Sequence, residues 1–255
     1  MTFEIRDIET FLLILVRITA FIFAAPFFSL RNVPQRVKVG FSLFFSIIIF
    51  QTIPLTTLNY QGVIGFAGLI ISEAMVGLII GFFANVSYYI LSFAGQMMDM
   101  EMGFSMVNEF DPVANFQTTI TSNYYSYLIM LMMLVTNLHH YIITAIVDTY
   151  KVIPIGEANF KPAMYVLMLQ FIKDYFIIGF RIVLPVFAAI LVVNAILAIL
   201  AKVAPQLNMF VIGLQLKVFV GLIILFLLTG FIPSISNLIF EEMIKMMRLG
   251  IEALR

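Results

Sequence analysis

The sequence predicts an all-α, polytopic membrane protein built from long, kinked helices. Of its 255 residues, 62% are hydrophobic and only 11% are charged, whereas a soluble domain carries roughly 25% charged residues and fewer than half apolar ones. Long stretches such as 39–72 and 74–98 contain no charge at all. These stretches do not alternate between apolar and polar residues as the strands of a membrane β-barrel do. Because lipid cannot satisfy open backbone groups, we expect the stretches to be helical.

Six hydrophobic segments follow one another along the chain: roughly 10–30, 38–53, 63–98, 124–147, 162–200 and 214–240. The residues before the first segment include Glu4, Asp7 and Glu9 against one Arg6. A cleaved signal peptide would begin basic, so we expect the first segment to be a retained helix.

Two of these segments are too long for simple spans. As helices, 63–98 and 162–200 would measure about 54 and 58 Å, against a hydrocarbon core of about 30 Å. Each must tilt strongly, break into a hairpin, or extend beyond the bilayer. Gly77 and Gly81 in the first segment and Pro185 in the second are the expected break points.

The basic residues do not settle a topology. They cluster at Arg31, Arg36 and Lys38, at Lys202 and Lys217, and at Lys245, Arg248 and Arg255. Strict alternation of six spans puts the first two clusters on one side and the last on the other, against the positive-inside rule. A hairpin in either long segment would change the number of membrane crossings, and with it the side on which the later basic clusters lie. The conflict indicates that this is not a plain up-and-down bundle in lipid.

The composition also excludes several function classes. Fourteen Lys and Arg residues balance fourteen Asp and Glu, so no net charge attracts a nucleic acid. The absence of Cys excludes disulfides, thiolate metal sites and Cys nucleophiles. No common catalytic or nucleotide-binding motif is present, and the adjacent His139 and His140 would point about 100° apart on a helix. We therefore expect no enzyme activity, no metal site and no cofactor.

Several ionisable residues interrupt the apolar stretches. A charge at mid-bilayer costs at least ~2.5–3.5 kcal/mol, so each needs a partner, water or a protein environment. They could form a proton or ion relay, or they could form ion pairs between helices or subunits, which is the favoured interpretation. The residues are Arg17, Glu73, Lys173, Asp174 and Arg181.

Two further patterns concern packing. The spacing of Gly77 and Gly81 allows close approach of two helices, which indicates that 63–98 packs against protein. The stretch Gln96 to Asn115 combines acidic residues with five Met and two Phe side chains. Methionine fills irregular gaps, so core packing is the favoured role, although such side chains could also close a hydrophobic constriction in a pore.

A set of short motifs then runs in order along essentially the whole chain. It comprises Arg17 and Pro26, the turn from Val33-Pro34 to Lys38-Gly40, Glu73 with Gly77 and Gly81, Ala94-Gly95-Gln96 with Asp99 and Gly103, Asp111-Pro112, Pro185, Ala204-Pro205-Gln206 with Asn208, and Gly213 with Lys217. This set resembles the FliR family, a membrane component of the flagellar type III protein export gate with homologues in injectisomes. Leu138-His139 resembles a Gly-Leu-His stretch of that family, with Asn137 in place of the glycine.

The resemblance implies a fold of long, kinked helical hairpins of the export-gate type. Residues 1–180 would be FliP-like and residues 181–255 FliQ-like within one membrane domain. The chain would complete a ring of FliP-like and FliQ-like subunits in the bacterial inner membrane, at the flagellar basal body. FlhA-like and FlhB-like proteins would be further partners, and unfolded flagellar proteins would be the substrates.

The resemblance also implies roles for individual residues. A loop of this subunit would help to plug the pore, with Phe104, Met106, Val107 and Phe110 as plug candidates. A methionine gasket would involve Met97, Met98, Met100 and Met102. Neighbouring chains would supply partners for Glu73, Lys173, Asp174 and Arg181. The helix-packing and turn residues would be Gly77, Gly81, Pro185, Pro205, Gln206, Asn208 and Lys217.

Two alternatives remain open at this point. A secondary transporter or ion-coupled carrier shares broken helices, buried charges and glycine-rich segments with this chain. The chain could equally be the equivalent subunit of a virulence injectisome, because the resemblance includes that homologue. An intramembrane enzyme is disfavoured because the motifs are missing.

Overall fold

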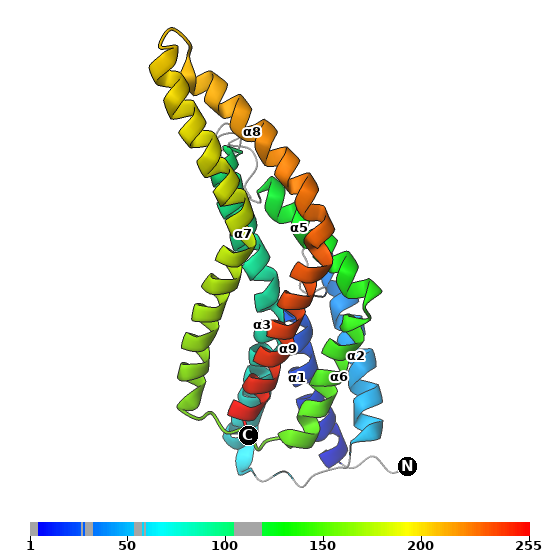
Figure 1. The fold of residues 1–255 in the computed structure, drawn as a ribbon. Coiled ribbons are helices and arrows are strands. Elements are labelled where there is room, and N and C mark those ends of the chain that lie inside the picture. Colours follow the sequence, from blue (N-terminus) through cyan, green and yellow to red (C-terminus); the bar gives the residue numbers. More distant parts are fainter. Residues whose placement is uncertain (1–4, 27, 29–32, 54–57, 59, 105–118) are drawn as a thin grey trace. The chain divides into compact units, whose positions relative to one another are not determined.

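The computed structural model describes residues 5–26, 28, 33–53, 58, 60–104 and 119–255. Every element within these ranges is a helix (Figure 1), which confirms the all-α prediction. In chain order they are α1 (Ile5–Ala24), α2 (Gln35–Thr52), α3 (Gly62–Met102), α5 (Ile120–Val135), α6 (Leu138–Val152), α7 (Ala163–Val203), α8 (Met209–Leu228), the 3₁₀ helix η1 (Thr229–Phe231) and α9 (Ile232–Ala253).

Three of the described helices are long and apolar enough to cross a membrane. They are Gly62–Met102, Met164–Val203 and Met209–Ala253, in which α8, η1 and α9 run on from one another. A fourth span is present if α5 and α6 together count as one broken span. The polytopic membrane class that the sequence predicts is therefore confirmed.

The two overlong segments do not break into hairpins. Helices α3 and α7 each run unbroken for 41 residues, or about 60 Å at 1.5 Å per residue. The expected breaks at Gly77 and Gly81 are wrong, and Pro185 lies inside α7 without ending it. A glycine costs only about 1 kcal/mol in a helix, and apolar helices tolerate proline where neighbouring groups satisfy the freed carbonyl. The predicted segment 124–147, by contrast, is divided between α5 and α6.

The chain forms two compact units. Unit 1 comprises Met1–Ser87, Asn137–Ile172 and Phe240–Arg255. Within it α1 packs on α2, where the rings of Phe11 and Phe50 meet edge to face at 5.9 Å. The residues completely or almost completely buried in its core include Leu13, Ile14, Ile18, Phe21, Val76, Ile80, Phe83, Ile142, Ile146, Met243, Met246, Met247 and Leu254.

Just before α3, a hydrogen bond outside the membrane-spanning segments links the chain to α1. The hydroxyl group of Tyr60 donates a hydrogen bond of 2.5 Å to Oε1 of Glu9. This hydrogen bond to the carboxylate raises the pKa of Tyr60, because ionisation of the phenol would remove the donor and set two negative charges side by side.

Unit 2 comprises Tyr88–Thr136 and Lys173–Ile239. Here α7 and α8 form a hairpin around the turn at residues 204–208 (Figure 1), and Gly213 of α8 lies against Leu197 of α7. Asn208 caps α8, because its Oδ1 accepts hydrogen bonds from the backbone N–H groups of Phe210 (3.2 Å) and Val211 (3.4 Å). The core of this unit includes Ile90, Leu91, Ala94, Met98, Met102, Tyr125, Ile129, Ile182, Val183, Val186 and Ile190.

Asn137 marks the point where α5 gives way to α6. Its backbone has φ 57° and ψ 21°, in the left-handed region, and it is the one non-glycine residue with positive φ in the described part of the chain. Glycine and asparagine are the residues that adopt this conformation most readily. The replacement of glycine by Asn137, noted as a departure from the FliR pattern, therefore preserves the turn.

This geometry predicts different effects of two substitutions at one position. Asn137→Gly should leave the free energy of unfolding nearly unchanged, whereas Asn137→Val should lower it by about 1–2 kcal/mol, because a β-branched residue is strained at positive φ. Titration of the purified protein with a denaturing detergent measures this. His140→Val, at an exposed helical position with normal φ, is the control. Equal losses at both positions would contradict the turn argument.

Candidate functional site

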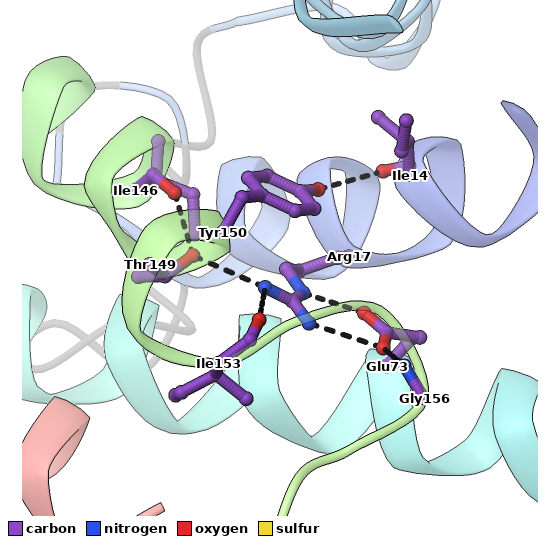
Figure 2. A network of polar contacts seen from close by, with 8 residues as sticks. All are labelled: Ile14, Arg17, Glu73, Ile146, Thr149, Tyr150, Ile153 and Gly156. Atoms are coloured by element: carbon purple, nitrogen blue, oxygen red, sulfur yellow. Dashed lines mark hydrogen bonds and ion pairs between the residues drawn. The ribbon is translucent and has the colours of Figure 1, made fainter. Parts of the chain in front are cut away.

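A buried ion pair joins α1 to α3 in unit 1 (Figure 2). Arg17 Nε donates to Glu73 Oε2 at 2.5 Å, and Arg17 Nη2 donates to Glu73 Oε1 at 3.0 Å. Both side chains are fully buried. The planar guanidinium thus binds the carboxylate through two parallel hydrogen bonds, which is the strongest geometry available to such a pair.

Residues at the end of α6 and just after it complete the coordination of both charges. Arg17 Nη1 donates to Thr149 Oγ1 (3.3 Å) and to the carbonyl oxygen of Ile153 (3.1 Å). The backbone N–H of Gly156 donates to Glu73 Oε1 at 2.8 Å. The ring of Tyr150 lies 4.2 Å from Arg17 Cζ, and its hydroxyl donates to the carbonyl oxygen of Ile14. The cation therefore has hydrogen-bond acceptors and an aromatic face around it.

Glycine residues bring these segments close enough for the pair to form. A Cβ atom at Gly77 would overlap the carbonyl oxygen of Arg17 itself, and one at Gly81 would come within 2.7 Å of Ala24 Cβ. The Gly77-xxx-Gly81 spacing thus lies at the crossing of α3 with α1. Gly156, with φ +82°, supplies the left-handed position of the turn that aims its N–H at Glu73.

The contacts around the pair favour a structural role over a relay. Arg17 uses Nε, Nη1 and Nη2, and Glu73 accepts three hydrogen bonds. Four of the five N–H groups of Arg17 and most of the acceptor positions of Glu73 are therefore used within the chain. The expectation that a neighbouring chain supplies the partner of Glu73 is wrong, since its partner is Arg17 of the same chain.

The other predicted ionisable residues lie in unit 2, on α7. Lys173 and Arg181 are exposed, and Asp174 is half-buried and has a polar partner. Their predicted role in subunit assembly stays a prediction. Of the predicted turn residues, Pro205 and Gln206 are exposed in the turn between α7 and α8, and Pro185 is exposed on α7.

A second buried carboxylate, Asp99, lies near the end of α3 in unit 2. Its two carboxylate oxygens accept hydrogen bonds from the backbone N–H of Thr121, at 3.3 and 3.2 Å, and Oδ1 also accepts one from the Thr121 hydroxyl. Sequence reasoning placed Asp99 among the acidic residues of the methionine-rich stretch and among the motifs of the family resemblance, with no structural role. Its position three residues before Met102 and four before Gly103 gave no signal that it reaches the first turn of α5.

The methionine candidates differ in their surroundings. Met98 and Met102 are fully buried within the chain, and Met102 lies against Gly221 of α8. Met100 is 64% exposed, and Met97 is half-buried. Phe104 is buried. Met106, Val107 and Phe110 lie outside the described residues.

An open pocket of 260 Å³ adjoins Met100 at the end of α3. Glu101 lines it from α3 and Lys217 lines it from α8, so the predicted packing residue Lys217 faces a pocket that also contains an acid. Within the described ranges, no group of three or more His, Asp or Glu side chains could hold a metal ion.

Comparison with known proteins gives the family. The model for "Bacterial export proteins, family 1" matches residues 8–243. The flagellar biosynthetic protein FliR of Bacillus subtilis (strain 168) is 33% identical over 244 residues, covering 93% of each chain. The chain belongs to the FliR family of bacterial export proteins. FliR of Escherichia coli (strain K12) is 28% identical over 235 residues, covering 91% of this chain and 89% of its own, and FliR of Aquifex aeolicus is 25% identical over 246 residues, covering 96% and 95%.

Membership of the FliR family confirms the resemblance that the ordered motifs indicate. It also agrees with the prediction that the protein is not an enzyme, because this family is one of export proteins. The buried pair is accordingly part of a membrane export component whose helices it holds together.

Removal of one member of this pair should be strongly destabilising. Glu73→Gln or Arg17→Gln should each lower the free energy of unfolding by about 3–5 kcal/mol, because the remaining charge stays buried without its counter-charge. The double variant Arg17→Gln/Glu73→Gln should lose clearly less than the sum of the two single losses. Titration with a denaturing detergent measures each variant.

Asp148→Asn is the matched control for this prediction. Asp148 forms an ion pair with Lys151 at 2.7 Å, but both side chains are largely exposed. An exposed pair contributes about 0–1 kcal/mol. If the Glu73 variants lost no more stability than this control, the Arg17–Glu73 pair would not hold α1 to α3.

Proposed function

We propose that this protein is a subunit of the flagellar type III export gate in the bacterial inner membrane, where it forms part of the path for unfolded flagellar proteins. The observation that carries the proposal is the match of residues 8–243 to the export family, together with FliR relatives that align over nearly their whole length. Each of the relatives named above is a flagellar biosynthetic protein, which favours a flagellum over an injectisome.

The helices leave much apolar surface for other molecules to cover. Only 28% of the most apolar part of Met164–Val203 is buried within the chain, and only 11% in Met209–Ala253. Lipid alone covers a length of about 30 Å, whereas α7 spans about 60 Å. Contacts with other subunits would cover the remainder. The exposed apolar side chains of α7 and α8 include Leu184, Phe187, Leu191, Ile196, Ile199, Phe219 and Phe226.

The partners in this proposal are FliP-like and FliQ-like subunits, with FlhA-like and FlhB-like proteins as further components. Residues 1–180 would take the place of one FliP-like subunit and residues 181–255 that of one FliQ-like subunit. Most of the apolar hairpin of α7 and α8 falls in the second part, and α7 itself begins in the first. Lys173, Asp174 and Arg181 would meet charged groups of these partners.

The methionine-rich end of α3 is proposed to seal the closed pore. Met97 and Met100 are the gasket candidates with surface available to a partner or a pore, because Met98 and Met102 are buried in their own unit. Phe104, which is buried within its own unit, and Met106, Val107 and Phe110 are the plug candidates. Bulky apolar side chains exclude water from a narrow passage and thereby block ions.

The carrier alternative has lost part of its support. Carriers bind their substrate where helices are broken near the middle of the bilayer. The two segments that suggested such breaks are the continuous helices α3 and α7. The buried charges, which also suggested a carrier, include one pair that is closed within the chain.

Replacement of plug residues should open the closed gate to ions. Phe104→Ala, Met106→Ala and Phe110→Ala, combined in one chain, should raise the ion permeability of cells that assemble a normal amount of gate, because smaller side chains cannot keep the passage dry. Uptake of a small dye and loss of membrane potential measure this. The control is Ile177→Ala, an exposed apolar side chain on α7. Unchanged permeability with intact assembly would contradict the sealing role.

Isolation in a mild detergent tests the partners. The protein should copurify in a large hetero-oligomer whose other components mass spectrometry identifies as export-gate subunits. Glu73→Gln should reduce the yield of this complex. A monodisperse single chain with saturable uptake of a small solute would support the carrier, and a normal yield with a selective loss of proton-driven export would make Glu73 part of a relay.

A further inference from the structure

The first turn of α5 receives its cap from another helix. The residue at the N-cap position, Thr119, makes no capping hydrogen bond with its own side chain. Asp99 of α3 takes this role, because its carboxylate accepts hydrogen bonds from both the backbone N–H and the hydroxyl group of Thr121. A negative charge at this place also matches the positive end of the helix dipole.

Close packing holds the same two helices together beside this cap. A Cβ atom at Gly95, one turn before Asp99, would overlap the backbone of Ser122. Any side chain at Gly95 would therefore push the first turn of α5 away from α3. The hydrogen bonds of Asp99 and the contact at Gly95 thus act on adjacent turns of α3 and on adjacent residues of α5.

The end of α3 is also fixed within unit 2. Gly103 has φ +85°, the left-handed conformation that ends many helices. Met102 lies against Gly221, and a Cβ atom at Gly103 would come within 2.7 Å of Leu214 Cδ1. Phe104 is buried next to this point. The chain thus leaves α3 at a fixed place, and it enters α5 at a place that Asp99 fixes.

We propose that Asp99 is a positioning residue of the gate, whose carboxylate clamps the first turn of α5 to the end of α3 and so holds Phe104 in its buried position. This inference rests on the proposed sealing function, because it gives the sealing stretch a defined attachment. It assigns to Asp99 and Thr121 a role that does not require either to face the pore.

Chemical labelling tests the clamp directly. The natural chain contains no Cys, so Phe104→Cys introduces one thiol at the end of α3. In the assembled, detergent-purified gate, a polar maleimide should label this thiol faster when Asp99→Asn or Thr121→Val is added. Loss of one hydrogen bond to a charged group changes an equilibrium by roughly tenfold to a hundredfold, which sets the expected rise in labelling rate.

Two variants serve as matched controls. Thr121→Ser retains the hydroxyl donor and should keep the slow labelling. Glu101→Gln makes the same change of charge two residues along α3, at a half-buried acid that lines the adjacent pocket. It should also keep the slow labelling. Thr121→Val leaves the charge of Asp99 in place, so it tests the clamp even if Asp99→Asn fails to assemble.

Ion permeability then separates this proposal from the sealing function. Faster labelling in the Phe104→Cys background, together with a rise in permeability when Asp99→Asn or Thr121→Val is introduced into the chain that retains Phe104, supports the clamp as part of the seal. Unchanged labelling in both assembled variants overturns the clamp, and it leaves the sealing function intact if the triple plug variant still leaks. Faster labelling in the Asp99 and Thr121 variants, with no leak from them or from the triple plug variant, overturns the sealing function and the gate role of Asp99 with it.

Discussion

The requirement that a buried cation have its counter-charge at hand organises unit 1. Arg17 sits in the middle of α1 with no exposed surface, and the carboxylate of Glu73 neutralises it there. The pair forms because Gly77 and Gly81 let α1 lie directly against α3. The segment from Thr149 to Gly156 must then fold back to satisfy the remaining donors and acceptors. One electrostatic demand thus brings together three parts of the chain that are far apart in sequence.

In unit 2, hydrogen bonds hold a second buried carboxylate of the same helix against a later segment of the chain. Glu73 and Asp99 both lie on α3, both are fully buried, and each accepts a backbone N–H from a segment that comes later in the chain. A glycine close by, Gly77 or Gly95, removes the side chain that would keep that neighbour away. Buried carboxylates are costly in an apolar surrounding, so each of them specifies one arrangement of helices and disfavours others. Helix α3 is therefore the element from which both units are built.

Much of this could be predicted from the sequence, because composition and spacing act locally. The lack of charges predicted helices in a membrane, and Gly77-xxx-Gly81 predicted a close contact with protein. The intramolecular partner of Glu73 could not be predicted, since no periodicity links residue 73 to Arg17 or to Gly156. The continuity of α3 and α7 was missed because Gly and Pro weaken a helix locally, while packing over many turns decides whether it continues. The cap on α5 was missed because Asp99 and Thr121 are 22 residues apart in sequence.

The long separation between Arg17 and its partners has a consequence for synthesis of the protein. The acceptor Glu73 follows Arg17 by 56 residues, and the carbonyl of Ile153 follows it by 136. When α1 leaves the ribosome, neither has been translated. The first helix must therefore remain in the insertion machinery, or in contact with water, at least until the carboxylate of Glu73 on α3 has been made. Its transfer into lipid depends on the arrival of α3, and the order of insertion is set by a residue in the first helix.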